Sequence, residues 1–483
     1  MNARWRAFLQ RLSLFDHKHH SVRFLQDGVV LLLMCVLLYY GASWQIFKSH
    51  TDAASYQCYA LAFWHGLTPL PLAPSNQCAF LHDSARSSTL FSQDVILHTL
   101  RQWGMPAGLI QFVAAQSAGL PLHALPHEYP LLVLLPFSLA LFVPVYWYQV
   151  AFAGWMLLLA VGMYVLLRRS RGAALVCALY LVAGGWATMV GRFDAVPSLL
   201  TLGALLYALR GRWHWAFALL ALATLFKFYP LVLLIPFLLA RQQEVQGRWY
   251  AWRRWSPLGV YVLLGVLVTM VSLLLSVEGT LSPFSYFQSR PIQVESLGAS
   301  VLWLGSFLGA GPLTYAYTYG SLNVFSPLSA GVSVGITVLL VVGLLYVYWL
   351  QWRGCLDLAR ACLLVLLVII VASKVFSPQY LIWVIPFVAY IGRSALKWLV
   401  PWTLVGLLTT WIYPYLYLMR HRLEDVPTLP LFYPVVTLRN LLLFAITLSL
   451  LVYYSRSKAL RRSETSSDLS ASASSTVVVA PNP

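Results

Sequence analysis

Charged side chains are scarce in this sequence. Asp, Glu, Lys and Arg make up 10% of its 483 residues, whereas hydrophobic residues make up 60%. Soluble domains need a far more polar surface, so this composition excludes them and indicates a membrane protein. Acidic residues are the rarer sign, with 15 Asp and Glu against 32 Lys and Arg.

Several sequence motifs are also missing. The chain has no Walker loop, no dinucleotide-binding fingerprint and no C-x-x-C pair, so a nucleotide-sugar donor has no recognisable docking motif. Only six cysteines occur. Cys58 and Cys78 fall in one long loop, and the sequence leaves open whether they form a disulfide. Residues 1–26 are mostly polar and no A-x-A site follows the first apolar run, so we expect a retained first helix rather than a cleaved signal peptide.

Long apolar runs, in contrast, recur from Gly28 to Tyr454. A bilayer core about 30 Å thick needs roughly 20 apolar residues per spanning helix. The runs therefore predict an all-α polytopic membrane protein with about twelve transmembrane helices, within a range of about 10 to 13. The predicted spans are 27–47, 146–167, 172–190, 195–209, 214–228, 230–241, 257–276, 330–350, 359–373, 380–392, 397–414 and 434–454.

The pattern also predicts how the chain is divided. We expect a cytoplasmic N-terminal segment (1–26), a transmembrane catalytic domain (27–454) with a long outer loop (48–145), and a disordered cytoplasmic tail (455–483), whose end is rich in Ser. The histidines His17, His19 and His20 are interpreted as part of a solvated segment facing the membrane, with a metal site as the less favoured alternative.

The basic residues set the orientation. With the N-terminus inside, most of the 32 Lys and Arg fall in inner loops, as the positive-inside rule requires. The net charge of +17 is thus a topology signal, and we expect no nucleic-acid partner. The polar motifs that interrupt the apolar sequence then all lie on the outer side: Asp52, HEYP (127–130), GRFD (191–194), KFYP (227–230), RPIQVES (290–296) and SKVFSPQY (373–380).

These motifs predict one outer cavity. A lysine at mid-bilayer costs about 2.5 to 3.5 kcal/mol, so such residues face a bundle interior, a water-filled cavity or a charged ligand. Two plainer alternatives remain open. Tyr-Pro and Gly-Arg pairs are common at helix ends, where such groups reach the interface, and Arg192 and Asp194 could pair with each other.

In order, these motifs resemble the polyprenyl-phosphate-sugar-dependent glycosyltransferases of the GT-C superfamily, and specifically glycosyltransferase family 87, represented by actinobacterial α-1,2-mannosyltransferases that elaborate lipoglycans. RPIQVES and KVFSPQYLIW are the most specific pieces. The resemblance implies a GT-C fold whose outer loop is partly helical and carries the catalytic acid. Within that loop, 87–103 reads as an amphipathic stretch and 129–144 as an apolar stretch that does not cross the membrane.

Two departures from the family pattern matter. The usual YPP is Tyr129-Pro130-Leu131 here, and the loop acid is single, with Asp52 followed by Ala53. The missing second acid removes a metal ligand, so we expect neither a metal nor another cofactor.

The resemblance and the chemistry together assign roles to the outer residues. The lipid phosphate is a good leaving group, so cations that stabilise its charge would serve, and one carboxylate can act as general base for the acceptor hydroxyl. The predicted base is Asp52. Lys227 is the first candidate for binding the donor phosphate, with Arg192, Arg290 and Lys374 as competitors. The predicted substrate-binding residues are Glu128, Tyr129, Asp194, Tyr229, Gln293, Glu295, Gln379 and Tyr380.

The expected protein is therefore a multi-pass bacterial plasma-membrane enzyme with an extracytoplasmic active site. It would transfer mannose from a polyprenyl-phosphate donor to a lipid or glycan acceptor, with inversion, among membrane lipids. The alternative from another class is a transporter or flippase of a lipid-linked saccharide, in which intramembrane charges mark a substrate path. A transporter should show repeated halves and polar residues reachable from both faces. This chain shows no repeat and its polar motifs cluster on one side.

Overall fold

The computed structural model describes residues 25–67, 77–81, 91–309 and 311–474, with side chains up to residue 456. The histidines His17, His19 and His20 and the last residues of the predicted tail lie outside the described residues.

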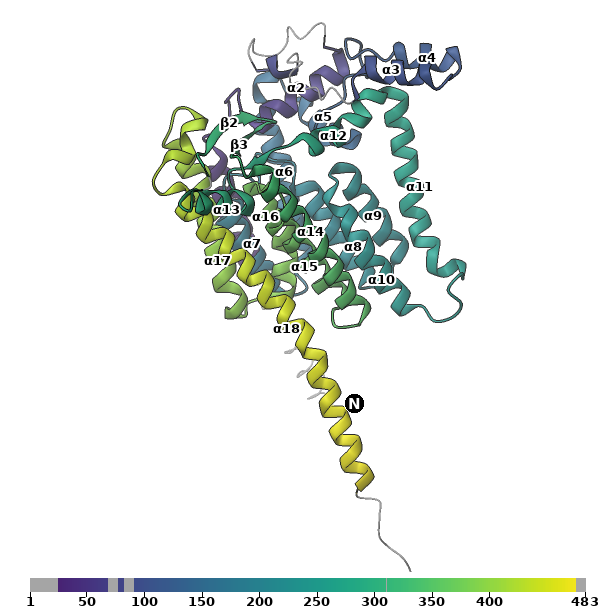
Figure 1. Ribbon diagram of the computed structural model, residues 1–483, viewed down its shortest axis with the longest axis vertical. Helices are drawn as coiled ribbons and strands as arrows, with labels where there is room; N and C mark the ends of the chain where they lie inside the picture. Colours follow the sequence, from purple (N-terminus) through teal and green to yellow (C-terminus); the bar gives the residue numbers. More distant parts are fainter. Residues whose placement is uncertain (1–24, 68–76, 82–90, 310, 475–483) are drawn as a thin grey trace, which may run out of the picture. The chain divides into compact units, whose positions relative to one another are not determined.

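The described chain is mostly helical (Figure 1). Six of its helices are long and apolar enough to cross a membrane by length and composition: Leu25–Ala42, Val145–Leu167, Trp252–Leu275, Ser329–Trp352, Leu396–Leu416 and Phe432–Arg456. The other six predicted spans form shorter helices: α7 (Arg171–Gly185), α8 (Ala195–Ala208), α9 (Trp213–Phe226), α10 (Leu234–Glu244), α15 (Leu358–Val371) and α16 (Leu381–Gly392). A polytopic helical membrane protein is confirmed, whereas twelve crossings stay a prediction.

The short helices have a physical explanation in α15. Its 14 residues extend only about 21 Å, less than the roughly 30 Å of a bilayer core. Nearly every side chain of α15 is buried, on all sides of the helix. A helix that is shielded from lipid in this way can be shorter than the bilayer core is thick. The non-helical backbone beyond its ends can be buried in protein and does not have to face lipid.

The chain divides into two compact units, which we describe separately. Unit 1 comprises Met1–Leu202, Val268–Gln288 and Pro378–Tyr415, and unit 2 comprises Gly203–Leu267, Ser289–Ser377 and Leu416–Pro483. Besides Leu25–Ala42, α7, α16 and the start of α8, unit 1 contains α2 (Asp52–His65), α3 (Gln93–Gln102), α4 (Ala107–Ala114), α5 (Leu134–Leu139), α6 (Tyr148–Leu167), most of α12 (Val277–Ser289) and α17 (Leu396–Thr410).

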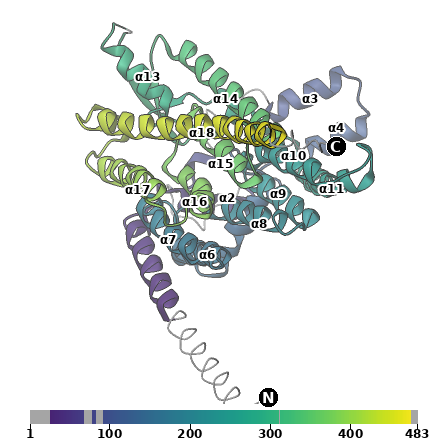
Figure 2. The same cartoon turned by 90° about the horizontal axis from the view of Figure 1, so that it is seen from below.

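Helix α7 is the centre of unit 1 and packs against α6, α16 and α17 (Figure 2). Small residues allow the close approach of α7 and α17: a Cβ added to Gly406 would lie 3.0 Å from the backbone N of Gly184. Such contacts between small residues are a common way for membrane helices to associate. The Thr410 hydroxyl donates to the Ala183 carbonyl (2.6 Å), which closes the same interface.

The loop 48–145 of unit 1, predicted to lie on the outer side, is partly helical in its described residues, as the family resemblance implies. The predicted amphipathic stretch 87–103 contains α3, whose N-cap Ser92 accepts from the Val95 backbone N–H. The apolar stretch 129–144 contains only α5, six residues long, flanked by 3₁₀ turns. A segment this short and broken cannot cross a bilayer alone.

Unit 2 contains α9, α10, α15, most of α11 (Trp252–Leu275), α13 (Leu297–Ser306), α14 (Ser329–Trp352), α18 (Phe432–Ser474), β1 (Ile292–Gln293), β2 (Thr314–Thr318) and β3 (Ser321–Phe325). Helix α15 packs against α14 and α18. Helix α18 continues to Ser474, whereas the disordered tail from residue 455 stays a prediction. A helix already nucleated by its apolar part propagates at little further cost.

The small sheet corrects the all-α prediction. It is antiparallel, in the order β1-β3-β2. The strands β2 and β3 form a hairpin whose two loop residues, Tyr319 and Gly320, both have positive φ. That geometry is typical of a type I′ turn, and alternating Thr and Tyr in β2 favour a strand. The apolar periodicity on which the prediction rests cannot detect strands this short.

Candidate functional site

Asp52 is the first residue of α2 in unit 1. The preceding residue, Thr51, caps the helix by accepting a hydrogen bond from the Ala54 backbone N–H at 3.3 Å. A carboxylate in the first turn is stabilised by the positive end of the helix dipole. The sequence therefore places a carboxyl group at a capped helix terminus.

The partner of Asp52 is Arg192. One guanidinium nitrogen of Arg192 (Nη1) forms an ion pair with Oδ2 of Asp52, and the two side chains are 17% and 29% exposed. Oδ2 itself is buried, so the exposed surface of Asp52 belongs to the rest of its side chain, which includes Oδ1. The pair thus orients the carboxylate while part of Asp52 stays accessible.

Asp194 lies in the same GRFD motif but has a different environment. It is almost fully buried, and the indole Nε1 of Trp383 donates to its Oδ1 at 2.6 Å. Trp383 in turn stacks on Tyr380, with ring centroids 4.0 Å apart. Gln379, next to Tyr380, is buried at the start of the same turn. The Asp194 carboxylate is therefore linked to the SKVFSPQY motif within unit 1.

An aromatic cluster connects the remaining motifs of unit 1. Tyr56, one turn after Asp52 in α2, lies 6.2 Å from Tyr129 between ring centroids, and Tyr129 lies 5.0 Å from Phe193. Burial raises the pKa of Tyr56 well above its ordinary value, and the charges of Asp194 and Glu128 raise it further. Burial likewise raises the pKa of Tyr129. Both hydroxyls therefore stay protonated and can donate hydrogen bonds.

The pKa of His127, which precedes Glu128, is shifted in the opposite direction. Burial lowers the pKa of His127, because the apolar surroundings disfavour the charged imidazolium. His127 is thus neutral at pH 7 and supplies no positive charge to this motif.

Helix α2 is fixed by covalent and polar contacts. Cys58 and Cys78 form a disulfide, which answers the question that the sequence left open. The Gln77 amide donates to the side-chain oxygen of Gln57 at 2.9 Å, and the Gln57 amide donates to the Val145 carbonyl at 2.7 Å. These contacts hold the helix that carries Asp52.

Lys227 and Tyr229 belong to unit 2. Lys227 is the C-cap of α9, and its backbone N–H donates to the Ala223 carbonyl at 3.0 Å. Tyr229 is buried in the 3₁₀ turn that follows. Lys227 therefore stands at a helix end, half-buried.

The RPIQVES motif meets the SKVFSPQY motif inside unit 2. The Gln293 backbone N–H in β1 donates to the Lys374 carbonyl at 3.0 Å, and the Val294 backbone N–H donates to the Leu322 carbonyl at 3.1 Å. Arg290 precedes β1 and is half-buried.

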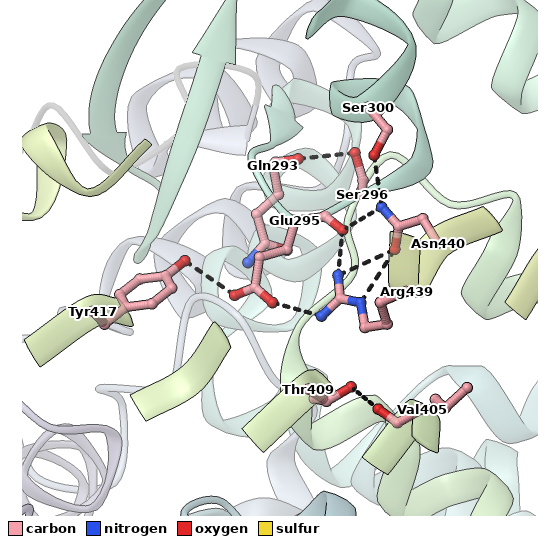
Figure 3. A network of polar contacts seen from close by, with 9 residues as sticks. All are labelled: Gln293, Glu295, Ser296, Ser300, Val405, Thr409, Tyr417, Arg439 and Asn440. Carbon is pink, nitrogen blue, oxygen red and sulfur yellow. Dashed lines mark hydrogen bonds and ion pairs between the residues drawn. The ribbon is translucent and has the colours of Figure 1, made fainter. Parts of the chain in front are cut away.

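Glu295 is the acid of a second ion pair, shown in Figure 3. Arg439 Nη1 lies 2.9 Å from Glu295 Oε2, and Nη2 donates to the Glu295 carbonyl at 2.6 Å. The Tyr417 hydroxyl donates to Oε1 at 3.0 Å. The side chains of Arg439 and Glu295 are 0% and 1% exposed. This pair is closed to solvent.

All thirteen predicted site residues are divided between the two units. Asp52, Glu128, Tyr129, Arg192, Asp194, Gln379 and Tyr380 belong to unit 1, and Lys227, Tyr229, Arg290, Gln293, Glu295 and Lys374 belong to unit 2. Sequence reasoning missed Trp383 and Arg439. The signal for Arg439 was available, since an Arg-Asn pair interrupts the apolar run 434–454, and an intramembrane arginine is a functional candidate. Trp383 gave no such signal among 19 tryptophans.

The acids do not gather into an evident metal cluster. Among the residues that the structure describes, no group of three or more His, Cys, Asp or Glu is placed to hold an ion. Mg²⁺ needs only one or two carboxylates when substrate phosphate supplies the rest, so metal-free chemistry stays a prediction.

These features define a polytopic helical membrane protein with a carboxylate and cations at helix ends. The sequence model of glycosyltransferase family 87 matches residues 128–378, just over half of the chain. The chain belongs to glycosyltransferase family 87 and is a glycosyltransferase, with a sugar donor and an acceptor as substrates. A search of curated proteins finds no match. The match covers Arg192, Lys227 and Glu295 but does not reach Asp52, so the role of Asp52 is a proposal.

Proposed function

We propose that this glycosyltransferase transfers mannose from a polyprenyl-phosphate-linked donor to a lipid or glycan acceptor at the extracytoplasmic face of a bacterial plasma membrane. The observation that carries the proposal is the ion pair of Asp52 and Arg192. The Asp52 carboxylate is oriented by Arg192, is partly accessible, and lies on the same helix as Tyr56 of the buried aromatic cluster. The family of this chain transfers sugars.

In the proposed reaction Asp52 is the general base. The acceptor oxygen attacks the anomeric carbon of the donor sugar and forms the new C–O bond. The bond from that carbon to the phosphate oxygen breaks, and polyprenyl phosphate leaves with the electron pair. The hydroxyl proton passes to the accessible part of the Asp52 carboxylate, while Arg192 holds Oδ2. A single displacement of this kind inverts the anomeric centre.

Cations stabilise the leaving phosphate in this proposal. The candidates are Lys227, Arg290 and Lys374, while Arg192 is engaged by Asp52. Protonated tyrosines such as Tyr56 and Tyr129 can add neutral donors for substrate oxygens. A good leaving group needs no strong general acid, so the proposal includes neither a metal nor another cofactor.

The finer assignments rest on different grounds. Mannose and the polyprenyl carrier come from the family resemblance, and the face comes from the basic residues. Single cysteines beside Asp52, Arg192, Lys227, Glu295 and Lys374, on a background lacking the native cysteines, should react with an impermeant thiol reagent from outside. Labelling of the loops 168–172 or 241–255 from that side would contradict the assigned face.

The direct experiment uses the purified protein in liposomes with polyprenyl-phosphate-mannose and lipid or glycan acceptors. We expect a mannosylated acceptor and stoichiometric release of polyprenyl phosphate. Movement of the lipid-linked sugar between leaflets without transfer would instead support a flippase and contradict the proposal. Transfer from a nucleotide sugar alone would contradict the assigned donor class.

A further inference from the structure

Arg439 is the most deeply buried charged side chain in the described part of unit 2, and its contacts are unusually complete. Besides both bonds to Glu295, its Nε and Nη2 each donate to Oδ1 of Asn440 at 3.2 Å. Buried ion pairs of this kind rarely add net stability, because desolvation offsets the Coulomb attraction. A pair of this kind is retained for the groups that it holds in place.

The pair holds the segment 293–296. Asn440 donates to the Glu295 carbonyl at 3.1 Å and to the Ser300 hydroxyl at 2.9 Å. The Ser296 hydroxyl donates to the Gln293 carbonyl at 2.8 Å and caps α13. Side chain and main chain of the segment are thus tied to α18 together (Figure 3).

The same arginine contacts the segment that carries Lys374. Its guanidinium carbon lies 4.2 Å from the ring centroid of Phe376, two residues after Lys374. From the other side, the Gln293 backbone N–H donates to the Lys374 carbonyl. Arg439 therefore fixes both chain segments that meet at Lys374.

Two polar side chains at this junction are candidates for contact with a ligand. Over the described residues, the Lys374 ammonium has no acidic partner, and burial lowers the pKa of Lys374. Gln293 is 5% exposed, and its side-chain oxygen has no hydrogen-bond partner among the same residues. A cation and a buried acceptor suit a ligand that carries both an anionic oxygen and a hydroxyl group.

We propose that Lys374 and Gln293 form the subsite for the glycosyl phosphate of the donor, and that Arg439 is the positioning residue of this subsite. The Lys374 ammonium binds a phosphate oxygen, and Oε1 of Gln293 accepts a sugar hydroxyl. Arg439 touches no substrate and acts through the segments it fixes. The inference rests on the proposed function, and it selects Lys374 over Lys227 for the phosphate.

The test separates binding of donor from turnover. Lys374→Met should raise the donor KM about 10- to 100-fold, the loss expected for a hydrogen bond to a charged group, with the acceptor KM unchanged. The double variant E295M/R439M replaces a buried pair by apolar groups and should insert normally, yet it should raise the donor KM similarly. Adding Lys374→Met to this double variant should raise the donor KM by less than the product of the two separate fold-changes, because the residues act as one unit.

Two controls keep the test decisive. D357N/R360Q removes an exposed pair of the same unit and should leave the donor KM unchanged. Arg439→Lys retains the charge but cannot reproduce the planar set of donors, so it should raise the donor KM even if the double variant inserts poorly. A wild-type donor KM in Arg439→Lys or in inserted E295M/R439M overturns the positioning role, and a wild-type donor KM in Lys374→Met overturns the subsite.

A binding measurement distinguishes this inference from the proposed function. Polyprenyl phosphate should bind wild type and bind Lys374→Met at least tenfold more weakly, whereas inorganic phosphate should not compete. Equal binding of polyprenyl phosphate to both proteins, or effective competition by inorganic phosphate, contradicts the subsite. Absence of sugar transfer by wild type, with this binding difference intact, would instead contradict the proposed function alone.

Discussion

The two units each contain an acid paired with an arginine, and the pairs differ most in exposure. In unit 1, Arg192 and Asp52 are 17% and 29% exposed. In unit 2, Arg439 and Glu295 are 0% and 1% exposed. An accessible carboxylate can exchange a proton with a substrate, whereas a carboxylate closed to solvent on all sides can only hold other groups in place. The same pair of residue types therefore serves two different purposes.

The local structure supports this difference. Asp52 has a helix terminus and one arginine around it, which orient it and leave surface for an acceptor. Glu295 uses both carboxylate oxygens and its carbonyl in hydrogen bonds. Removing one partner of the buried pair leaves an uncompensated charge, which typically costs 3 to 5 kcal/mol, roughly the scale of a small domain's stability.

The largest expected effect follows from changing the accessible acid. Asp52→Asn keeps size and polarity but cannot accept a proton, so kcat should fall by about 100- to 10,000-fold, while donor binding is retained. Steady-state kinetics and donor binding on detergent-purified protein measure both. Asp94→Asn, at the first turn of α3, is the matched control and should be near wild type. Activity of Asp52→Asn near wild type would remove Asp52 from the mechanism.

Removal of the disulfide should have the next largest effect, on the unit that carries Asp52. The bridge closes a loop with a sequence separation of 20 residues, for which about 2 to 4 kcal/mol is typical. C58S/C78S should therefore unfold at a lower temperature, measured by thermal denaturation in detergent. Cys355→Ser changes a free cysteine and should leave the transition in place. An unchanged transition in the double variant would show that α2 is held by its polar contacts alone.

A smaller effect is expected from pH at Lys374. Burial lowers the pKa of Lys374, and only the protonated ammonium attracts phosphate. The kcat/KM for the donor should therefore fall as pH rises, beginning below the ordinary titration range of lysine. The nearby charges of Arg439 and Glu295 pair with each other. Lys374→Arg should move the alkaline limb upward, and an identical limb would assign it to another group.

The smallest effect is expected from chelation. If the cations of the chain stabilise the leaving phosphate alone, EDTA should leave the transfer rate unchanged. The assay requires protein that has been dialysed against chelator, with and without added Mg²⁺ or Mn²⁺. Activity lost with EDTA and restored by either ion would place a metal among the acids Asp52, Glu128 and Asp194.

The sequence predicted the membrane class and the twelve apolar segments that are helical, because apolar runs and their breaks are strong local signals. It gave no position for the helices α2, α4, α12 and α13. It did not predict the hairpin at Tyr319 and Gly320, whose strands are short and form only by pairing. The family and its motifs were likewise evident from RPIQVES and KVFSPQYLIW. The number of membrane crossings stays a prediction, because a buried helix such as α15 can cross without being as long as the bilayer core is thick.

The partners within each motif could not be predicted from spacing. Arg192 and Asp194 stand two residues apart, yet Arg192 pairs with Asp52 and Asp194 accepts from Trp383. Which partner is chosen depends on how α2, α8 and α16 pack in three dimensions. Arg439, far along the chain from Glu295, illustrates the same limit for the buried pair.

Single-turnover transfer with saturating polyprenyl-phosphate-mannose and acceptor tests the comparison of the two pairs most directly. The rate in Asp52→Asn should fall by about 100- to 10,000-fold, because the chemical step has lost its base. The rate in E295M/R439M should stay near wild type under the same conditions, because saturation overcomes a defect in donor binding. A normal rate in Asp52→Asn, or a rate in E295M/R439M reduced as far as in Asp52→Asn, would contradict the assignment of chemistry to the accessible pair and of positioning to the buried one.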